Sequence, residues 1–330
     1  MALRTPRLRA LLLAAALVVG GVACGDDDDD TATATTTTAE ETTTSTTAEP
    51  TTTEAPQQQE APYVVTVEDP GEEPRVQLRL DVDPGDTDQV TLRQEMTIEI
   101  EAGGQAQSAP SPVNEFDVTY TIDEVDGDRF TATGVYDDVR VLDTPGVDPA
   151  VADEVRSMME GFRSARALTT FTSQGGIVEA RLDGLEIPGA AGAFAEQMAG
   201  SFTDSAESMS LPFPDEAVGP GARWRVDTET EIAGMPVEIT TVVQLAELGE
   251  DRAAGTMDQT LRFVPGDVQI MGVAATVISG ELSGGGPIEW DLVGGVVPRS
   301  DVTIAGTAVM EANGTRIEQR QQQRITYTAR

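Results

Sequence analysis

The sequence contains no lysine and no histidine, and it has a single cysteine. Without histidine there is no imidazole to act as a general base, to activate a nucleophile or to bind a metal. Without lysine there is no Schiff base and no phosphate-loop lysine. An enzyme would be left with carboxylate pairs, which almost any acidic protein supplies. We therefore expect a protein without catalytic activity and without a cofactor.

Basic residues are also scarce, because 21 arginines stand against 57 acids and give a net charge of −36. A phosphate backbone repels such a chain, so we expect no nucleic-acid partner. The simplest interpretation is a solvated acidic surface. Two acidic clusters, at 81–88 and 123–128, leave calcium binding open as an alternative. Neither cluster has the ligand spacing of a calcium loop, and Asp is common at hairpin ends for turn reasons.

One apolar run, Ala10–Ala23, follows three arginines near the N-terminus and is too short for a comfortable membrane span. Such a run is typical of an export signal. The lone cysteine, Cys24, follows directly, and an exported chain offers it no disulfide partner. The segment "GVAC" resembles the lipobox of bacterial lipoproteins, with Gly21 in place of the usual leucine.

This resemblance implies that residues 1–23 are a lipoprotein signal peptide and that acyl chains such as palmitate are attached to Cys24. The chain would then be held by lipid on the extracytoplasmic side of the cell membrane. The alternative is an incidental cysteine near an ordinary cleavage site. Residues 24–62 continue as a Thr-, Asp-, Glu- and Pro-rich stretch that cannot bury a core, which predicts a disordered stalk.

Residues 63–330 are predicted to form a β-rich extracytoplasmic domain. Apolar residues alternate with polar ones from Val90 to Ile100 and again from Phe116 to Ile122, which is typical of half-buried antiparallel strands. Further strands are expected at 166–173, 177–183, 222–232, 236–248, 252–263, 268–282, 287–293, 300–311 and 315–328. Echoes between 123–134 and 246–257, and between 175–180 and 285–290, suggest two related meanders; chance similarity between hairpins is the alternative.

Two helices interrupt the strands. The first begins at Asp148, a favourable N-cap, with Pro149 at the first helical position. The second is expected at 189–208. Both carry Met and Phe stripes, which either pack as ordinary core or line a pocket for an apolar ligand. The stripe residues assigned to that candidate pocket are Met158, Phe162, Phe194, Met198 and Phe202.

The last strand places Arg316, Arg320 and Arg324 on one face and a row of glutamines on the other. Cross-strand acids are the simplest partners for the three arginines, and an anionic head group is the functional alternative. The segment "SLPFPDEAVGPGARW" at 210–224 is a proline- and glycine-rich connector. Its functional alternative is an exposed ligand gate built on Phe213 and Trp224.

The stretches "SLPFPDEAVGPGARWRV" and "TYTIDEVDGDRFTATGVYDDVRV" resemble an uncharacterised family of actinobacterial secreted lipoproteins with a domain of unknown function. In plan, the predicted α+β fold is mainly antiparallel β, a curved sheet or half-barrel with two inserted helices. That plan is similar to half-barrel lipid-carrier lipoproteins. The sequence therefore predicts a membrane-anchored protein that binds an apolar or amphiphilic ligand. The alternative is a non-catalytic structural or interaction protein of the cell surface.

Overall fold

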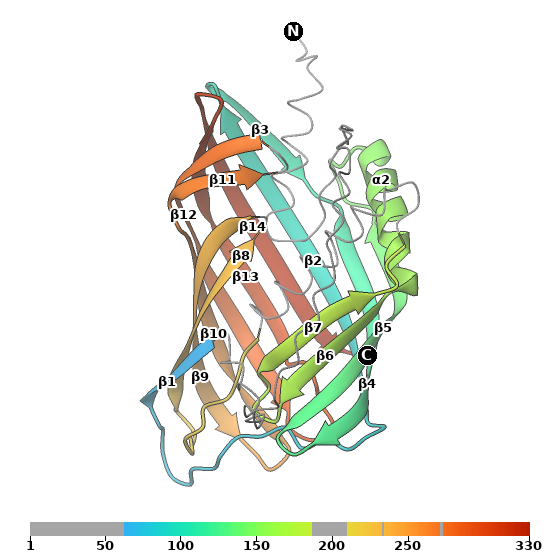
Figure 1. Ribbon diagram of the computed structural model, residues 1–330, viewed down its shortest axis with the longest axis vertical. Helices are drawn as coiled ribbons and strands as arrows, with labels where there is room; N and C mark the ends of the chain where they lie inside the picture. The colour runs from blue at the N-terminus through green and yellow to red at the C-terminus, as the bar shows by residue number, and fades with distance from the viewer. Residues whose placement is uncertain (1–62, 187–209, 233, 271–272) are drawn as a thin grey trace, which may run out of the picture.

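The computed structural model describes residues 63–186, 210–232, 234–270 and 273–330. Nearly all of them belong to one sheet (Figure 1). Its strands are β1 (Tyr63–Asp69), β2 (Thr87–Ala102), β3 (Gln105–Pro110), β4 (Val113–Asp126), β5 (Arg129–Leu142), β6 (Arg166–Thr172), β7 (Ile177–Asp183), β8 (Arg223–Ile232), β9 (Met235–Leu248), β10 (Arg252–Phe263), β11 (Gly266–Ile270), β12 (Val273–Asp291), β13 (Arg299–Ala312) and β14 (Thr315–Ala329).

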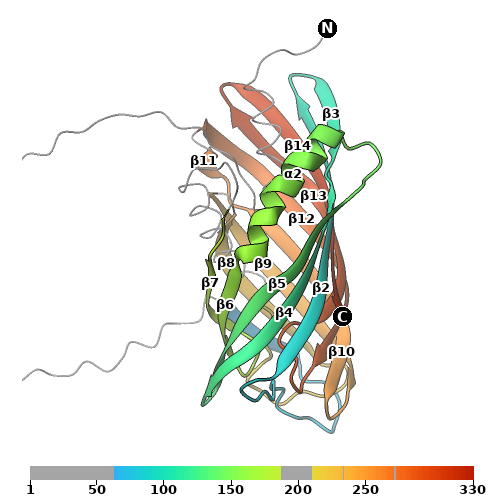
Figure 2. The same cartoon turned by 90° about the vertical axis from the view of Figure 1, so that its right-hand side faces the viewer.

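The sheet is antiparallel throughout and strongly curved, with β1 and β7 at its two edges (Figures 1 and 2). Its order is β1-β8-β9-β10-β12-β13-β14-β2-β4-β5-β6-β7, with β11 paired to β12 and β3 paired to β2. Because directly opposed residues lie on the same face, one apolar face continues across the strands and points inward. The prediction of a mainly antiparallel, curved α+β fold is confirmed.

Two strands were predicted at 268–282 and 287–293, but β12 runs unbroken through the three glycines at 284–286. A Cβ atom at Gly284 would lie 1.9 Å from the Thr303 carbonyl oxygen, and one at Gly286 would lie 1.9 Å from that of Asp301. The backbones approach so closely here that only glycine fits. The three glycines therefore allow β12 to pair closely with β10 and β13 without a break.

One described helix, α2 (Pro149–Met159), forms where the first helix was predicted, and the Asp148 carboxylate caps it by accepting from the Ala150 N–H at 2.9 Å. A short 3-10 turn, η1 (Glu160–Ser164), leads from it into β6. The second predicted helix lies outside the described residues. None of the helical segments in the described ranges has the length and apolar character needed to cross a membrane.

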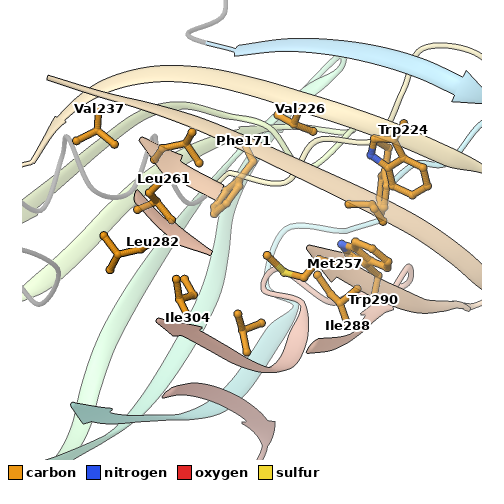
Figure 3. Close-up of a cluster of buried hydrophobic side chains, with 14 of the residues drawn as sticks. Phe171, Trp224, Val226, Val237, Met257, Leu261, Leu282, Ile288, Trp290 and Ile304 are labelled. Atoms are coloured by element: carbon orange, nitrogen blue, oxygen red, sulfur yellow. The ribbon is translucent and has the colours of Figure 1, made fainter. Parts of the chain in front are cut away.

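The segment between β1 and β2 crosses the lower end of the sheet in Figure 1. Its Leu78 is buried in the main core with Phe213, Trp224 and Trp290, and we define these four residues as the basal cluster. The rings of Phe213 and Trp290 meet edge-on at 5.4 Å, and those of Trp224 and Trp290 lie 6.2 Å apart. Figure 3 shows Trp224 and Trp290 beside Met257, within the inward-facing apolar side chains of several strands. Phe213 and Trp224 are each 1% exposed, so the alternative of an exposed gate built on them is wrong: both side chains belong to the core.

Candidate functional site

A groove opens beside β5, beyond the point where β6 begins. The pairing of β5 with β6 stops at Val135 and Arg166, and no other described strand pairs with the remainder of that edge of β5. Helix α2 and η1 lie along the upper part of β5 instead (Figures 1 and 2). Between them lies a groove of about 340 Å³, the α2–β5 groove. It is lined by Val139, Arg140, Val141, Leu142, Arg156, Met159, Glu160 and Arg163.

The floor of the groove is apolar. Val139 and Met159 are buried in a small core with Val90, Phe116 and Val118. Val141 packs against the same core, and Leu142 is half-buried at the end of β5. A volume of about 340 Å³ lies near the lower limit of small-molecule pockets, which start at roughly 300 Å³. The groove therefore has the size and the lining to hold a short apolar chain.

Three arginines form the rim, and Arg140 is fully engaged by acids of the protein itself. Its Nε donates to Glu115 at 3.0 Å, its Nη2 lies 3.0 Å from Asp117, and its Nη1 donates to Asp138 at 2.8 Å. Partial desolvation lowers the pKa of Arg140, but hydrogen bonds and charge from Glu115 and Asp117 outweigh it and raise that pKa. Arg140 is thus a fixed part of the wall.

Arg163 is positioned by two acceptors on β5. Its Nη2 donates to Asp138 at 2.8 Å and to the Val139 carbonyl oxygen at 3.0 Å. Slight desolvation raises the pKa of Asp138, but the Val139 N–H, Arg163 and Arg140 together hold it below its ordinary value. Asp138 therefore stays ionised at neutral pH and keeps both arginines in place.

The predicted helical stripe lies beside the groove. Phe162 packs edge-on against Phe116 at 5.9 Å and Tyr136 at 5.5 Å, and Met158 is half-buried. The stripe residue that lines the groove is the neighbouring Met159. The remaining predicted contacts, Phe194, Met198 and Phe202, and the predicted lipidation site, Cys24, lie outside the described residues.

The three arginines of β14 lie on the outer face of the sheet. Arg324 forms a two-fold ion pair with Asp301, at 2.8 and 2.6 Å, and Arg320 donates to Glu318 at 2.7 Å. The hydrogen bond from Arg324 lowers the pKa of Asp301. Arg316 is exposed and makes no ion pair within the described part of the chain. Glu318 is a neighbour on β14 itself, and the cross-strand acids expected as the simpler partners are Asp301 for Arg324 and Glu99 of β2, 3.9 Å away, for Arg320.

The glutamines of β14 line the inner face. Gln319, Gln321 and Gln323 are all buried, and Gln321 lies opposite Ile98 of β2. A cavity of about 10 Å³ adjoins Gln319 and Gln321. That is close to the minimum of roughly 10–15 Å³ that one water needs. The alternation of β14 predicted this face correctly, but in the described residues the larger opening is the α2–β5 groove.

The acidic clusters take part in the fold. The carboxylate of Asp88 is almost fully buried, pairs with Arg299, and accepts from the Val296 N–H at 2.9 Å. The carboxylate of Asp86 accepts from the Asp83 N–H at 2.8 Å and stabilises a turn. Within the ranges that the structure describes, no group of three or more acids is arranged to hold a metal ion.

Sequence reasoning missed the arginine rim. Arg156 and Arg163 lie seven residues apart on either side of Met159, which is the one local signal for a shared face. Arg140 joins them only because β5 folds against α2, and the groove exists only because β6 is shorter than β5. Neither fact can be derived from periodicity.

No family model matches the chain, and no curated protein matches it in sequence. Among solved structures, it is similar to a DUF1329 family protein from Desulfovibrio piger, with 11% identity and a TM-score of 0.19 over 72% of this chain and 85% of that one. It is also similar to a mutant of the Rh. blastica porin, with 6% identity and a TM-score of 0.20 over 72% of this chain and 99% of that one. A third similar structure is OpdL of Pseudomonas aeruginosa, with 7% identity and a TM-score of 0.19 over 74% of this chain and 99% of that one. Scores this low carry no argument about function.

Proposed function

We propose that the protein is a lipid-anchored extracytoplasmic protein that binds an apolar or amphiphilic ligand and does not convert it chemically. The observation that carries this proposal is the α2–β5 groove, whose apolar floor and arginine rim offer separate surfaces to a tail and to a head. Small-molecule sites are commonly concave and mostly apolar, with a few placed polar groups. The groove is more charged than that, because its lining has four apolar and four charged residues, which favours an amphiphile over a wholly apolar ligand.

The anchored location is supported by the sequence before the domain. An apolar run, the segment "GVAC" and a stalk without large apolar residues follow one another there. We expect Cys24→Ala to abolish incorporation of a palmitate analogue and to move the protein from the membrane fraction to the soluble fraction. Unchanged labelling and fractionation in this variant would contradict lipidation at Cys24.

Ligand binding is tested on the full chain, purified from a bacterial host, by native mass spectrometry and lipid extraction. We expect a co-purifying amphiphile that is lost in Leu142→Glu, because the new carboxylate would stand in the groove. The matched control is Leu248→Glu, since Leu248 is also half-buried at a strand end but lies on β9, away from the groove. Retention of the amphiphile by Leu142→Glu would contradict binding in the groove.

A second function has its own support. Phe162 is packed edge-on between Phe116 and Tyr136, as in an ordinary core, so part of the Met and Phe stripe is not free for a ligand. This packing favours a surface structural or interaction protein on a stalk. That protein would have a ligand-free mass and would gain no amphiphile on incubation.

A further inference from the structure

The arginines of the α2–β5 groove differ in how much of their hydrogen-bonding capacity is used. Each guanidinium carries five N–H donors. In Arg140 all three nitrogens are engaged by Glu115, Asp117 and Asp138. In Arg163 only Nη2 donates hydrogen bonds, to Asp138 and the Val139 carbonyl oxygen. In Arg156 only Nη1 donates, to Asp153. Within the described residues the other nitrogens of Arg156 and Arg163 have no partner.

The two incompletely engaged arginines are also held in place. Arg163 is fixed by two acceptors on β5, and Arg156 is tied to Asp153 three residues earlier on α2. Their side chains are 50% and 43% exposed, so a ligand can reach them from solvent. Preorganised guanidinium groups lose less conformational freedom on binding, and their planar donors match a carboxylate.

The surrounding charge limits which anion fits. The lining contributes three arginines and Glu160, and Arg140 is already balanced by acids. Asp138 forms an ion pair with Arg163, and Asp153 forms one with Arg156. Acids farther away than about 8 Å are largely screened at physiological ionic strength. Glu160 and the four acids that pair with the three arginines outnumber them, so the site has no excess of positive charge and opposes a doubly charged head more strongly than a singly charged one.

We infer that the α2–β5 groove takes a single-chain amphiphile with a carboxylate head, bound by Arg156 and Arg163, with its tail on Val139, Val141 and Met159. This inference rests on the proposed function and names its ligand class. Glu160, which lines the same groove, opposes the head by like charge. Its side chain makes no ion pair within the described part of the chain.

The test is isothermal titration calorimetry on the full chain with laurate, dodecanol and dodecyl phosphate, each below its micellar or solubility limit. We expect laurate to bind about tenfold more tightly than dodecanol, because charge-assisted hydrogen bonds are the stronger kind.

The double variant Arg156→Gln, Arg163→Gln is expected to remove this preference. The control Arg252→Gln, an exposed ion-paired arginine on β10, is expected to keep it. Glu160→Gln is expected to tighten laurate binding. Circular dichroism checks that each variant is folded.

Equal affinity of the wild type for laurate and dodecanol would overturn the carboxylate inference and leave the proposed function standing. Tighter binding of dodecyl phosphate than of laurate would overturn the choice of a singly charged head. Unchanged laurate affinity in the folded double variant would show that the arginines do not hold the head. Weaker laurate binding in Glu160→Gln would show that the head does not lie beside Glu160, which would overturn its placement in the groove. If none of the three compounds binds, the proposed function itself fails.

Discussion

The two ends of the curved sheet are made from different kinds of residue and differ in how completely they are filled. At the lower end, the basal cluster brings Phe213, Trp224 and Trp290 into ring contact, and all three are buried. At the upper end, α2 lies along an edge of β5 that no described strand pairs, and arginines surround an apolar floor. Burial alone therefore does not distinguish the candidate site from the rest of the core. The candidate site is a groove in which apolar and cationic side chains line an open volume.

The largest effect is expected in the basal cluster. Trp224→Ala should lower the free energy of unfolding by about 3–5 kcal/mol, as is typical when a large buried aromatic side chain is truncated. Phe162→Ala, beside the groove, should cost less because Phe162 is only half-buried. Urea unfolding of both variants measures this difference. A larger loss in Phe162→Ala would reverse our view of which end stabilises the fold.

A slightly smaller loss is expected from Asp88, which ties β2 to the first residue of β13, Arg299, and to the loop before it. Asp88→Ala should cost about 3 kcal/mol, because it leaves Arg299 and the Val296 N–H without their buried acceptor. The same substitution at Asp153, an exposed partner of Arg156, should cost less than about 1 kcal/mol. Equal losses in the two variants would mean that the Asp88 pair is not effectively buried.

The pH dependence of stability should differ between the inner face and the groove. Burial raises the pKa of Tyr327 to about 12 and also raises the pKa of Tyr120 and Tyr136. Their neutral forms therefore stabilise the fold up to the unfolded-state pKa near 10, and this contribution falls as the pH rises toward the folded values. Asp138, with a lowered pKa, stabilises the fold above about pH 4 and loses its contribution on acidification.

Denaturant unfolding across the pH range, with tyrosinate absorbance as the second readout, measures both effects. We expect tyrosine ionisation in the folded protein to begin above the pH range of the unfolded chain, together with a loss of stability. Tyrosine ionisation near pH 10, as in the unfolded chain, with no change in stability would contradict the burial of these hydroxyl groups. Asp138→Asn should weaken only the acid-side dependence.

The smallest effect on stability is expected at the rim of the groove. Arg163→Gln should change the free energy of unfolding by less than about 1 kcal/mol, because its side chain is half exposed and its ion pair is solvated. Thermal or urea unfolding checks this value. A loss comparable to that of Trp224→Ala would make Arg163 a structural residue and would weaken its assignment to a ligand.

Local patterns predicted most of the strands and the described helix. The predicted limits of β7 and β10 agree with the structure, and Asp148 caps α2 as its sequence position indicated. The break predicted between 282 and 287 was wrong because glycine in a strand can signal close approach of backbones as well as a turn. The groove could not be predicted, because it depends on how far β6 extends along β5.

The central claim is that the α2–β5 groove binds an amphiphile, and photocrosslinking of the full chain with a diazirine analogue of laurate tests it most directly. Peptide mapping by mass spectrometry would then locate the label. We expect labelling within Val139–Leu142 and Arg156–Arg163 that excess laurate suppresses. Labelling elsewhere in the chain, or labelling of the groove that laurate does not reduce, would contradict it.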